Sequence, residues 1–224
     1  MAAIRTSIQI PQCEHNRYRM QRALSWLERS EKADVTSEKF IFLWIAFNAA
    51  YGAEVSEILE NQLTENLKIR KFLREILKRD VHNKIEQILF EKHSGAVRVL
   101  LGNQFVFKLF WRWARDPSRA YNWRRGFESN GHRIRSAMEE KNVQAICREV
   151  FRRLYELRNQ VFHGGVNFTE GWVQTQIRDG TRIIADIVPV VLEIMKADIE
   201  ANPDSEVWGK LAYPSVSENE YRKH

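Results

Sequence analysis

The stretch FIFLWIAFNAAYG, residues 40–52, constrains the fold of this chain most, because it would be apolar on nearly every side of a helix. A surface helix has one apolar face, whereas a helix that is apolar all round is buried among other elements. Thr36 is a candidate N-cap before this stretch, and Gly52 is placed to end it. We therefore expect a helix between Thr36 and Gly52 in the middle of a helical bundle.

The rest of the chain also carries apolar residues at helical spacing, and no segment alternates apolar and polar residues as a half-buried strand does. Helices are predicted over residues 17–33, 56–79, 81–101, 104–114, 139–162 and 171–197. Residues 117–138 contain one proline and two glycines, so we expect them to be irregular. Gly180 and Pro189 should weaken or kink the last helix.

These patterns predict an all-α fold, a bundle of about five to eight helices without a sheet. The chain has 224 residues, of which 44% are hydrophobic, and this is enough apolar material for one compact domain. We expect residues 1–200 to form that domain, with a Trp- and Arg-rich insertion over 103–135. Residues 201–224 are expected to form a C-terminal extension whose last residues are mobile.

Several classes of protein are excluded by what the sequence lacks. No stretch offers the roughly 18 consecutive apolar residues of a membrane span, and the first residues do not resemble a secretory signal. Cys13 and Cys147 lie far apart, without the spacing of a disulfide framework or a zinc site. The phosphate-loop, dinucleotide, zinc-protease and nucleophile-elbow motifs are missing. We expect a cytoplasmic protein that uses no metal and no organic cofactor.

Positive charge is concentrated in one region. The whole chain carries 35 Lys and Arg against 29 Asp and Glu, yet residues 111–135 alone hold seven arginines and two acidic residues, together with five aromatic residues. Arginine forks bind phosphate and aromatic rings stack on unpaired bases, so RNA is the partner that this mixture suggests. The candidate RNA-binding residues are Arg112, Arg115, Arg124, Arg125 and Trp123. The alternative is a solvated basic face whose tryptophans belong to the core.

The segment LRNQVFHGG, residues 157–165, places polar residues at the end of an amphipathic helix. A structural role is available, because a histidine at this position can bond the last carbonyls and interact with the helix dipole. A catalytic role is available too. RNA cleavage without metal needs a base for the 2′-OH proton and a cation for the phosphate. Histidine is the residue type suited to proton transfer near neutral pH, which makes His163 the candidate base, and the guanidinium of Arg158 fits a phosphate.

This segment resembles the Arg–polar–xxx–His signature of the HEPN superfamily, all-α domains of which many are metal-independent endoribonucleases. The stretch EKFIFLWIAFNAAYG is similar to the buried second helix of these proteins. The stretch NFTEGWVQTQIRDGTRIIADIVPVVLEIM is similar to the helix after the motif in abortive-infection and toxin-type members. The resemblance implies cleavage through the 2′-OH to 2′,3′-cyclic phosphate and 5′-OH ends, in toxin–antitoxin systems or phage defence. We therefore hypothesise that His163 acts as general base or acid, that Arg158 binds the scissile phosphate, and that Asn159 orients His163 or the phosphate by hydrogen bonding.

The spacing of these residues bears on oligomeric state. Asn159 and His163 share one helix face, whereas Arg158 and His163 point about 140° apart in a regular helix. The resemblance implies a homodimer whose composite site receives all three residues from both copies. Two alternatives remain open. One is a non-catalytic module that binds nucleic acid or nucleotide, and the other is a protein-interaction subunit with a cognate antitoxin such as a small nucleotidyltransferase.

Overall fold

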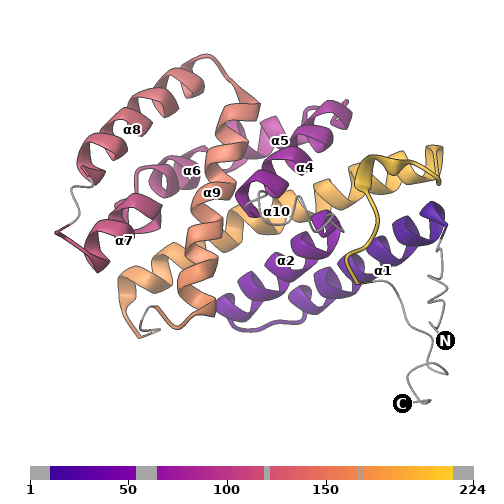
Figure 1. The fold of residues 1–224 in the computed structure, drawn as a ribbon, viewed down its shortest axis with the longest axis horizontal. Coiled ribbons are helices and arrows are strands. Elements are labelled where there is room, and N and C mark those ends of the chain that lie inside the picture. Colours follow the sequence, from indigo (N-terminus) through magenta and orange to yellow (C-terminus); the bar gives the residue numbers. More distant parts are fainter. Residues whose placement is uncertain (1–10, 54–64, 119–121, 166, 168, 214–224) are drawn as a thin grey trace, which may run out of the picture.

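A computed structural model describes residues 11–53, 65–118, 122–165, 167 and 169–213 of the chain (Figure 1). The described residues are mainly helical and contain no strand, which confirms the all-α prediction. The eight longer helices are α1 (Gln12–Glu31), α2 (Thr36–Tyr51), α4 (Glu65–Arg79), α6 (Ser94–Leu101), α7 (Lys108–Arg115), α8 (Trp123–Glu139), α9 (Val143–Phe162) and α10 (Gly171–Ala201). The short elements are α5 (Lys84–Glu86), a π-helix (Gln87–Lys92) and two 3₁₀ turns (Gln104–Val106 and Glu206–Trp208).

Helix α2 lies in the interior, as its apolar sequence predicts. It packs against α1 and α10, and the side chains of Phe40, Trp44 and Phe47 are almost completely buried. The ring of Phe47 lies 4.5 Å from that of Phe151 on α9 and 5.7 Å from that of Phe72 on α4, measured between ring centres. Helix α2 therefore lies at the centre of the bundle, in contact with α1, α4, α9 and α10.

Helix α10 continues without a break from Gly171 to Ala201, with Pro189 inside it. Gly180 marks the place where α10 packs against α9, which crosses it (Figure 1). A Cβ atom on Gly180 would lie 2.9 Å from Cδ2 of Leu157 and 3.2 Å from Cδ2 of Leu154. The glycine thus serves close approach of the two helices.

The expectation of an irregular segment over 117–138 is wrong, because α8 occupies most of it. Asn122 caps the helix, and its Oδ1 accepts a hydrogen bond from the backbone N–H of Arg125 at 3.0 Å. Gly126 faces α7, where a Cβ atom would lie 3.1 Å from Cδ1 of Leu109. Helices α7 and α8 thus lie side by side as a hairpin (Figure 1). Arg119 and Tyr121 of the basic region lie outside the described residues.

The described part of the C-terminal extension packs on the bundle. Trp208 is 4% exposed, lies 5.8 Å from the ring of Phe72, and donates from Nε1 to Oδ2 of Asp198 at 2.9 Å. Side chains of α1 donate to backbone carbonyls of the extension. These bonds join Gln12 to Gly209, Asn16 to Pro203 and Ser205, and Arg19 to Lys210.

Two expectations concern segments that the structure does not describe. The expected mobility of the chain end concerns residues 214–224, and part of the helix expected over 56–79 falls in residues 54–64; both lie outside the described residues. Within the described part of the chain, no helix combines the length and the apolar character needed to cross a membrane.

Candidate functional site

The end of α9 is closed by its backbone and by a glycine. The N–H of His163 donates to the carbonyl of Asn159 at 3.1 Å, and the N–H of Gly165 donates to the carbonyl of Gln160 at 2.8 Å. Gly164 has a φ of 63°, the left-handed conformation that commonly ends helices. The imidazole of His163 is exposed and makes no hydrogen bond with any described residue. The side chain of His163 is therefore not used to cap the helix.

Arg158 lies on a different side of α9. Its Nη1 donates to Oδ1 of Asn159 at 3.0 Å, and its guanidinium carbon lies 4.4 Å from the ring centre of Phe162. Its Nε is buried and has no hydrogen-bond partner among the described residues. Because α9 is helical up to Phe162, Arg158 and His163 leave it about 140° apart. One chain thus brings Arg158 and Asn159 together and does not bring Arg158 to His163.

Arg158 also faces a buried tyrosine. Its positive charge acts on Tyr51, at the end of α2, whose hydroxyl donates to Oε1 of Glu65 at the start of α4. Burial and the Glu65 carboxylate raise the pKa of Tyr51 well above its usual value, so this phenol stays protonated. The motif therefore adjoins the ends of two other helices on this side.

The basic residues of the α7–α8 hairpin are open to solvent. Arg112, Arg115, Arg124 and Arg125 are exposed. Burial raises the pKa of the Glu156 carboxyl on α9, and this effect outweighs the opposing charges of Lys108, Arg115 and Arg112. Helix α7 thus turns positive charge toward the same part of α9.

The tryptophans of the hairpin form a small core, as in the alternative interpretation of this region. Trp123 is 6% exposed, and its ring lies 5.1 Å from that of Phe110 and 5.9 Å from that of Trp113. Arg124 stacks over Trp123 at 4.9 Å. The ring of Trp123 is thus covered by its neighbours, and the predicted contact with RNA bases would require the ring to become exposed.

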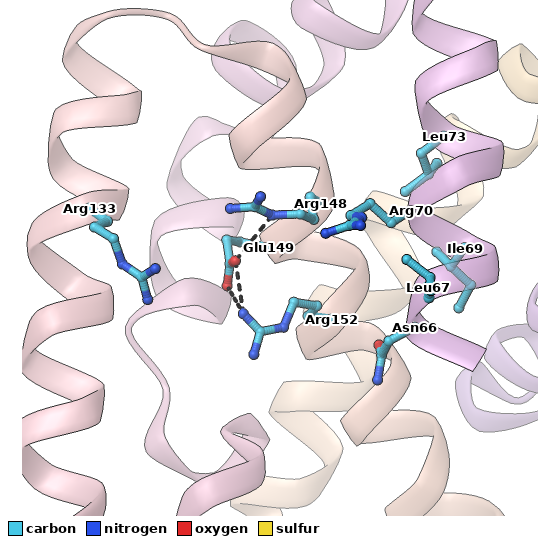
Figure 2. A pocket seen from close by; sticks show the side chains of 9 residues that line it. All are labelled: Asn66, Leu67, Ile69, Arg70, Leu73, Arg133, Arg148, Glu149 and Arg152. Carbon is cyan, nitrogen blue, oxygen red and sulfur yellow. Dashed lines mark hydrogen bonds and ion pairs between the residues drawn. The ribbon is translucent and has the colours of Figure 1, made fainter. Parts of the chain in front are cut away.

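A cavity of about 430 Å³ lies between α4, α8 and α9 (Figure 2). Its lining residues are Asn66, Leu67, Ile69, Arg70, Leu73, Arg133, Arg148, Glu149 and Arg152. Four of these are arginines and one is a carboxylate. Arg133 belongs to the basic region 111–135, but none of the nine lining residues is among the candidate RNA-binding or catalytic residues predicted from the sequence. On α9, the i,i+4 spacing of Arg148 and Arg152 does predict that these two arginines share one face of the helix. Nothing in the sequence indicates that Arg70 and Arg133 flank the same helix.

A buried polar network lies behind this cavity. Arg153 is 2% exposed and donates from Nη2 to Oδ1 of Asn130 at 2.7 Å, and Nδ2 of Asn130 donates to Oε2 of Glu149 at 3.2 Å. Burial lowers the pKa of Arg153 to about 10. Burial also raises the pKa of Glu149, but Arg152, Asn130 and Arg148 outweigh it, so that the pKa lies below its usual value. Glu149 therefore stays ionised at neutral pH.

Neither a metal site nor a known relative assigns a function. In the part of the chain that the structure describes, no group of three or more His, Cys, Asp or Glu side chains could hold a metal ion. Comparisons of the chain with protein-family models, with curated proteins and with solved structures found no match. Function is therefore inferred from the residues of this chain.

Proposed function

We propose that this chain is a metal-independent endoribonuclease of the HEPN type, which cleaves RNA through its 2′-OH to 2′,3′-cyclic phosphate and 5′-OH ends. One observation supports this most. The imidazole of His163 is exposed and unbonded to described residues, while Gly164 and the backbone close the helix. A histidine with no structural task at a helix end is available for proton transfer near neutral pH.

The outward face of α9 adds a second line of support. Arg148, Arg152, Asn159 and His163 follow at spacings of four, seven and four residues, which return to one face of a helix. His163 lies about 16 Å further along the helix axis than Arg152, at a rise of about 1.5 Å per residue. An RNA strand on this face would meet cations first and then the imidazole.

The chemistry requires few groups. In the proposed reaction, the 2′-oxygen attacks phosphorus and the bond to the 5′-oxygen breaks. His163 removes the 2′ proton or supplies a proton to the leaving oxygen. Arg158 stabilises the charge that develops on the phosphate, and Asn159 orients Arg158 through the bond between them.

We propose that the site is completed in a homodimer, because Arg158 and His163 of one chain diverge. In the dimer, the Arg158, Asn159 and His163 side chains of both copies would meet across a two-fold axis. The exposed ring of Phe162 supports an interface at this place. It lies next to His163 and is 41% exposed, so a second copy could bury it.

The decisive test is an RNA cleavage assay in EDTA with end-group analysis. We expect His163→Ala and Arg158→Ala to lose cleavage while keeping the helical circular dichroism of the parent. His82→Ala is the matched control, because His82 is an exposed histidine outside the helices. Cleavage by His163→Ala at the parent rate would refute the proposal.

A mixing experiment tests the composite site. An excess of inactive His163→Ala is added to the parent at saturating RNA, so that competition for substrate has no effect. Exchange of subunits should then lower parent activity if both copies contribute to one site. Unchanged activity after exchange, or a strict monomer in light scattering, would count against the dimer.

The second candidate is a non-catalytic module that binds nucleic acid. The position of Arg158 favours it, because this side chain bonds to Asn159 and stacks on Phe162 and does not reach His163 in its own chain. This candidate predicts RNA binding without fragments in the same EDTA assay.

A further inference from the structure

We propose that the arginine pocket, the cavity lined by Arg70, Arg133, Arg148 and Arg152, binds the linked phosphates of a single-stranded RNA backbone (Figure 2). A second cavity of about 370 Å³ adjoins it and shares Arg70 and Arg148 in its lining. Lys71 and Arg74 add two more cations there, and the second lining contains no carboxylate. The two cavities form one basic groove along α4 and α9.

Two of the four arginines have no structural partner among the described residues. Arg70 and Arg133 are exposed and make no ion pair or hydrogen bond with any described residue. Arg148 and Arg152 share one carboxylate, that of Glu149, at 3.5 Å and 2.9 Å. Clustered like charges disfavour the compact state, and in a hollow they focus the potential that attracts an anion. A bound polyanion would neutralise the cluster.

One of the arginines is held in place from the core. Nη1 of Arg152 donates to both carboxylate oxygens of Glu149, at 2.9 and 3.0 Å. Glu149 is 6% exposed and is fixed by Asn130, which in turn accepts a bond from buried Arg153. Nη2 of Arg152 makes no bond with the described residues, so this nitrogen remains available to a ligand. A preorganised guanidinium loses less entropy when it binds phosphate.

The lining indicates which part of RNA is recognised. Neither cavity has an aromatic residue in its lining, so neither offers a platform on which bases could stack. Guanidinium forks, by contrast, suit the phosphates. Because two basic cavities adjoin, the groove suits several linked phosphates better than one isolated phosphate. The same face of α9 leads on to Asn159 and His163.

That the polyanion is the RNA substrate rests on the proposed function, whereas binding of linked phosphates does not. Binding is therefore measured without cleavage, in the full chain carrying His163→Ala, by fluorescence anisotropy of a labelled oligouridine over a salt series. The test variant adds Arg70→Gln and Arg133→Gln. The matched control adds Arg178→Gln and Arg182→Gln, which remove the same charge from exposed positions of α10.

Each phosphate contact to a single strand contributes about 0.7 to the slope of log affinity against log salt. Loss of two contacts should reduce the magnitude of the slope by about 1.4. On going from 1 M to 0.1 M salt, the affinity of the test variant should therefore rise about 25-fold less than that of the parent. The control should keep the parent slope. Replacement of the same two arginines by lysine should restore most of it, since the charge returns. A test variant whose slope equals that of the control would overturn the proposal.

Competition distinguishes the sources of phosphate. We expect inorganic triphosphate and ATP to displace the oligouridine equally and weakly, because the groove does not recognise a base. Tight binding of ATP that depends on Arg70 and Arg133, with RNA binding unchanged, would overturn RNA as the ligand. If the groove variant loses RNA binding and the parent still does not cleave RNA, the groove stands and the ribonuclease proposal fails.

Discussion

The close crossing of α9 and α10 makes a quantitative prediction for Gly180→Ala. The new Cβ would lie 2.9 Å from Cδ2 of Leu157, 3.2 Å from Cδ2 of Leu154 and 3.6 Å from Cε2 of Phe40. All three neighbours are fully buried, so they must shift within the packed core to admit the new Cβ. Overpacking of this kind costs about 1–3 kcal/mol, whereas alanine gains about 1 kcal/mol over glycine in a helix. We expect the free energy of unfolding to fall by about 0–2 kcal/mol.

Gly131→Ala is the matched control for this prediction. Gly131 also lies inside a helix, α8, but a Cβ atom there would meet only the flexible end of Arg135, at 3.6 Å. The helix propensity of alanine should then act alone and raise the free energy of unfolding by about 1 kcal/mol. The two substitutions are chemically identical, so their difference of about 1–3 kcal/mol isolates the packing at Gly180.

Stability is measured by urea unfolding, followed by far-UV circular dichroism. If the dependence of the free energy of unfolding on urea concentration is the same in both variants and the parent, a shift of the midpoint reports a change in stability. Protein concentration is held constant, because a dimer makes the midpoint depend on concentration. Gly131→Ala should raise the midpoint, and Gly180→Ala should leave it unchanged or lower it. An equal rise for both variants would refute the tight crossing of α9 and α10.

Three further predictions follow from other parts of the bundle. Trp208→Ala should lower the free energy of unfolding by about 3–5 kcal/mol in the same urea assay, and a loss below about 1 kcal/mol would mean that the extension is not docked. Burial raises the pKa of Cys147 to about 12, so a thiol reagent should modify Cys13 alone in the native protein and both thiols in denaturant. Because the pKa of Glu149 is lowered in the fold, its stabilisation is present above the unfolded pKa of about 4.3 and is lost as pH falls through the lower folded value. The stability difference between the parent and Glu149→Gln should therefore shrink on acidification, and a constant difference would contradict this assignment.

The sequence predicts those parts of the fold that depend on the residue pattern within a single segment. The apolar run of α2 predicts its buried position because every side of that helix is apolar. Helix α8 was missed because Gly126 and Gly131 disfavour a helix when the segment is considered alone. Its cap at Asn122 and the packing of Gly126 on Leu109 outweigh that local cost. The second of these contacts involves another helix, which no local pattern contains.

The candidate site was only partly predictable for the same reason. The motif residues lie on one helix end, so sequence spacing alone predicts the divergence of Arg158 and His163. The arginine pocket combines side chains of α4, α8 and α9, and the proximity of Arg70 to Arg133 depends on the packing of three helices. Trp123 illustrates the limit of composition, because a tryptophan among arginines suits both an RNA platform and a small core. Only burial distinguishes these two roles.

The bonds between α1 and the C-terminal extension have an evolutionary consequence. Gln12, Asn16 and Arg19 donate to carbonyl oxygens, which every amino acid supplies, and so the path of the extension depends little on its side chains. Among the described residues of the extension, the buried apolar side chains are those of Trp208 and Leu211. Homologues should therefore diverge freely along this segment, while the donors on α1 and the tryptophan stay under purifying selection.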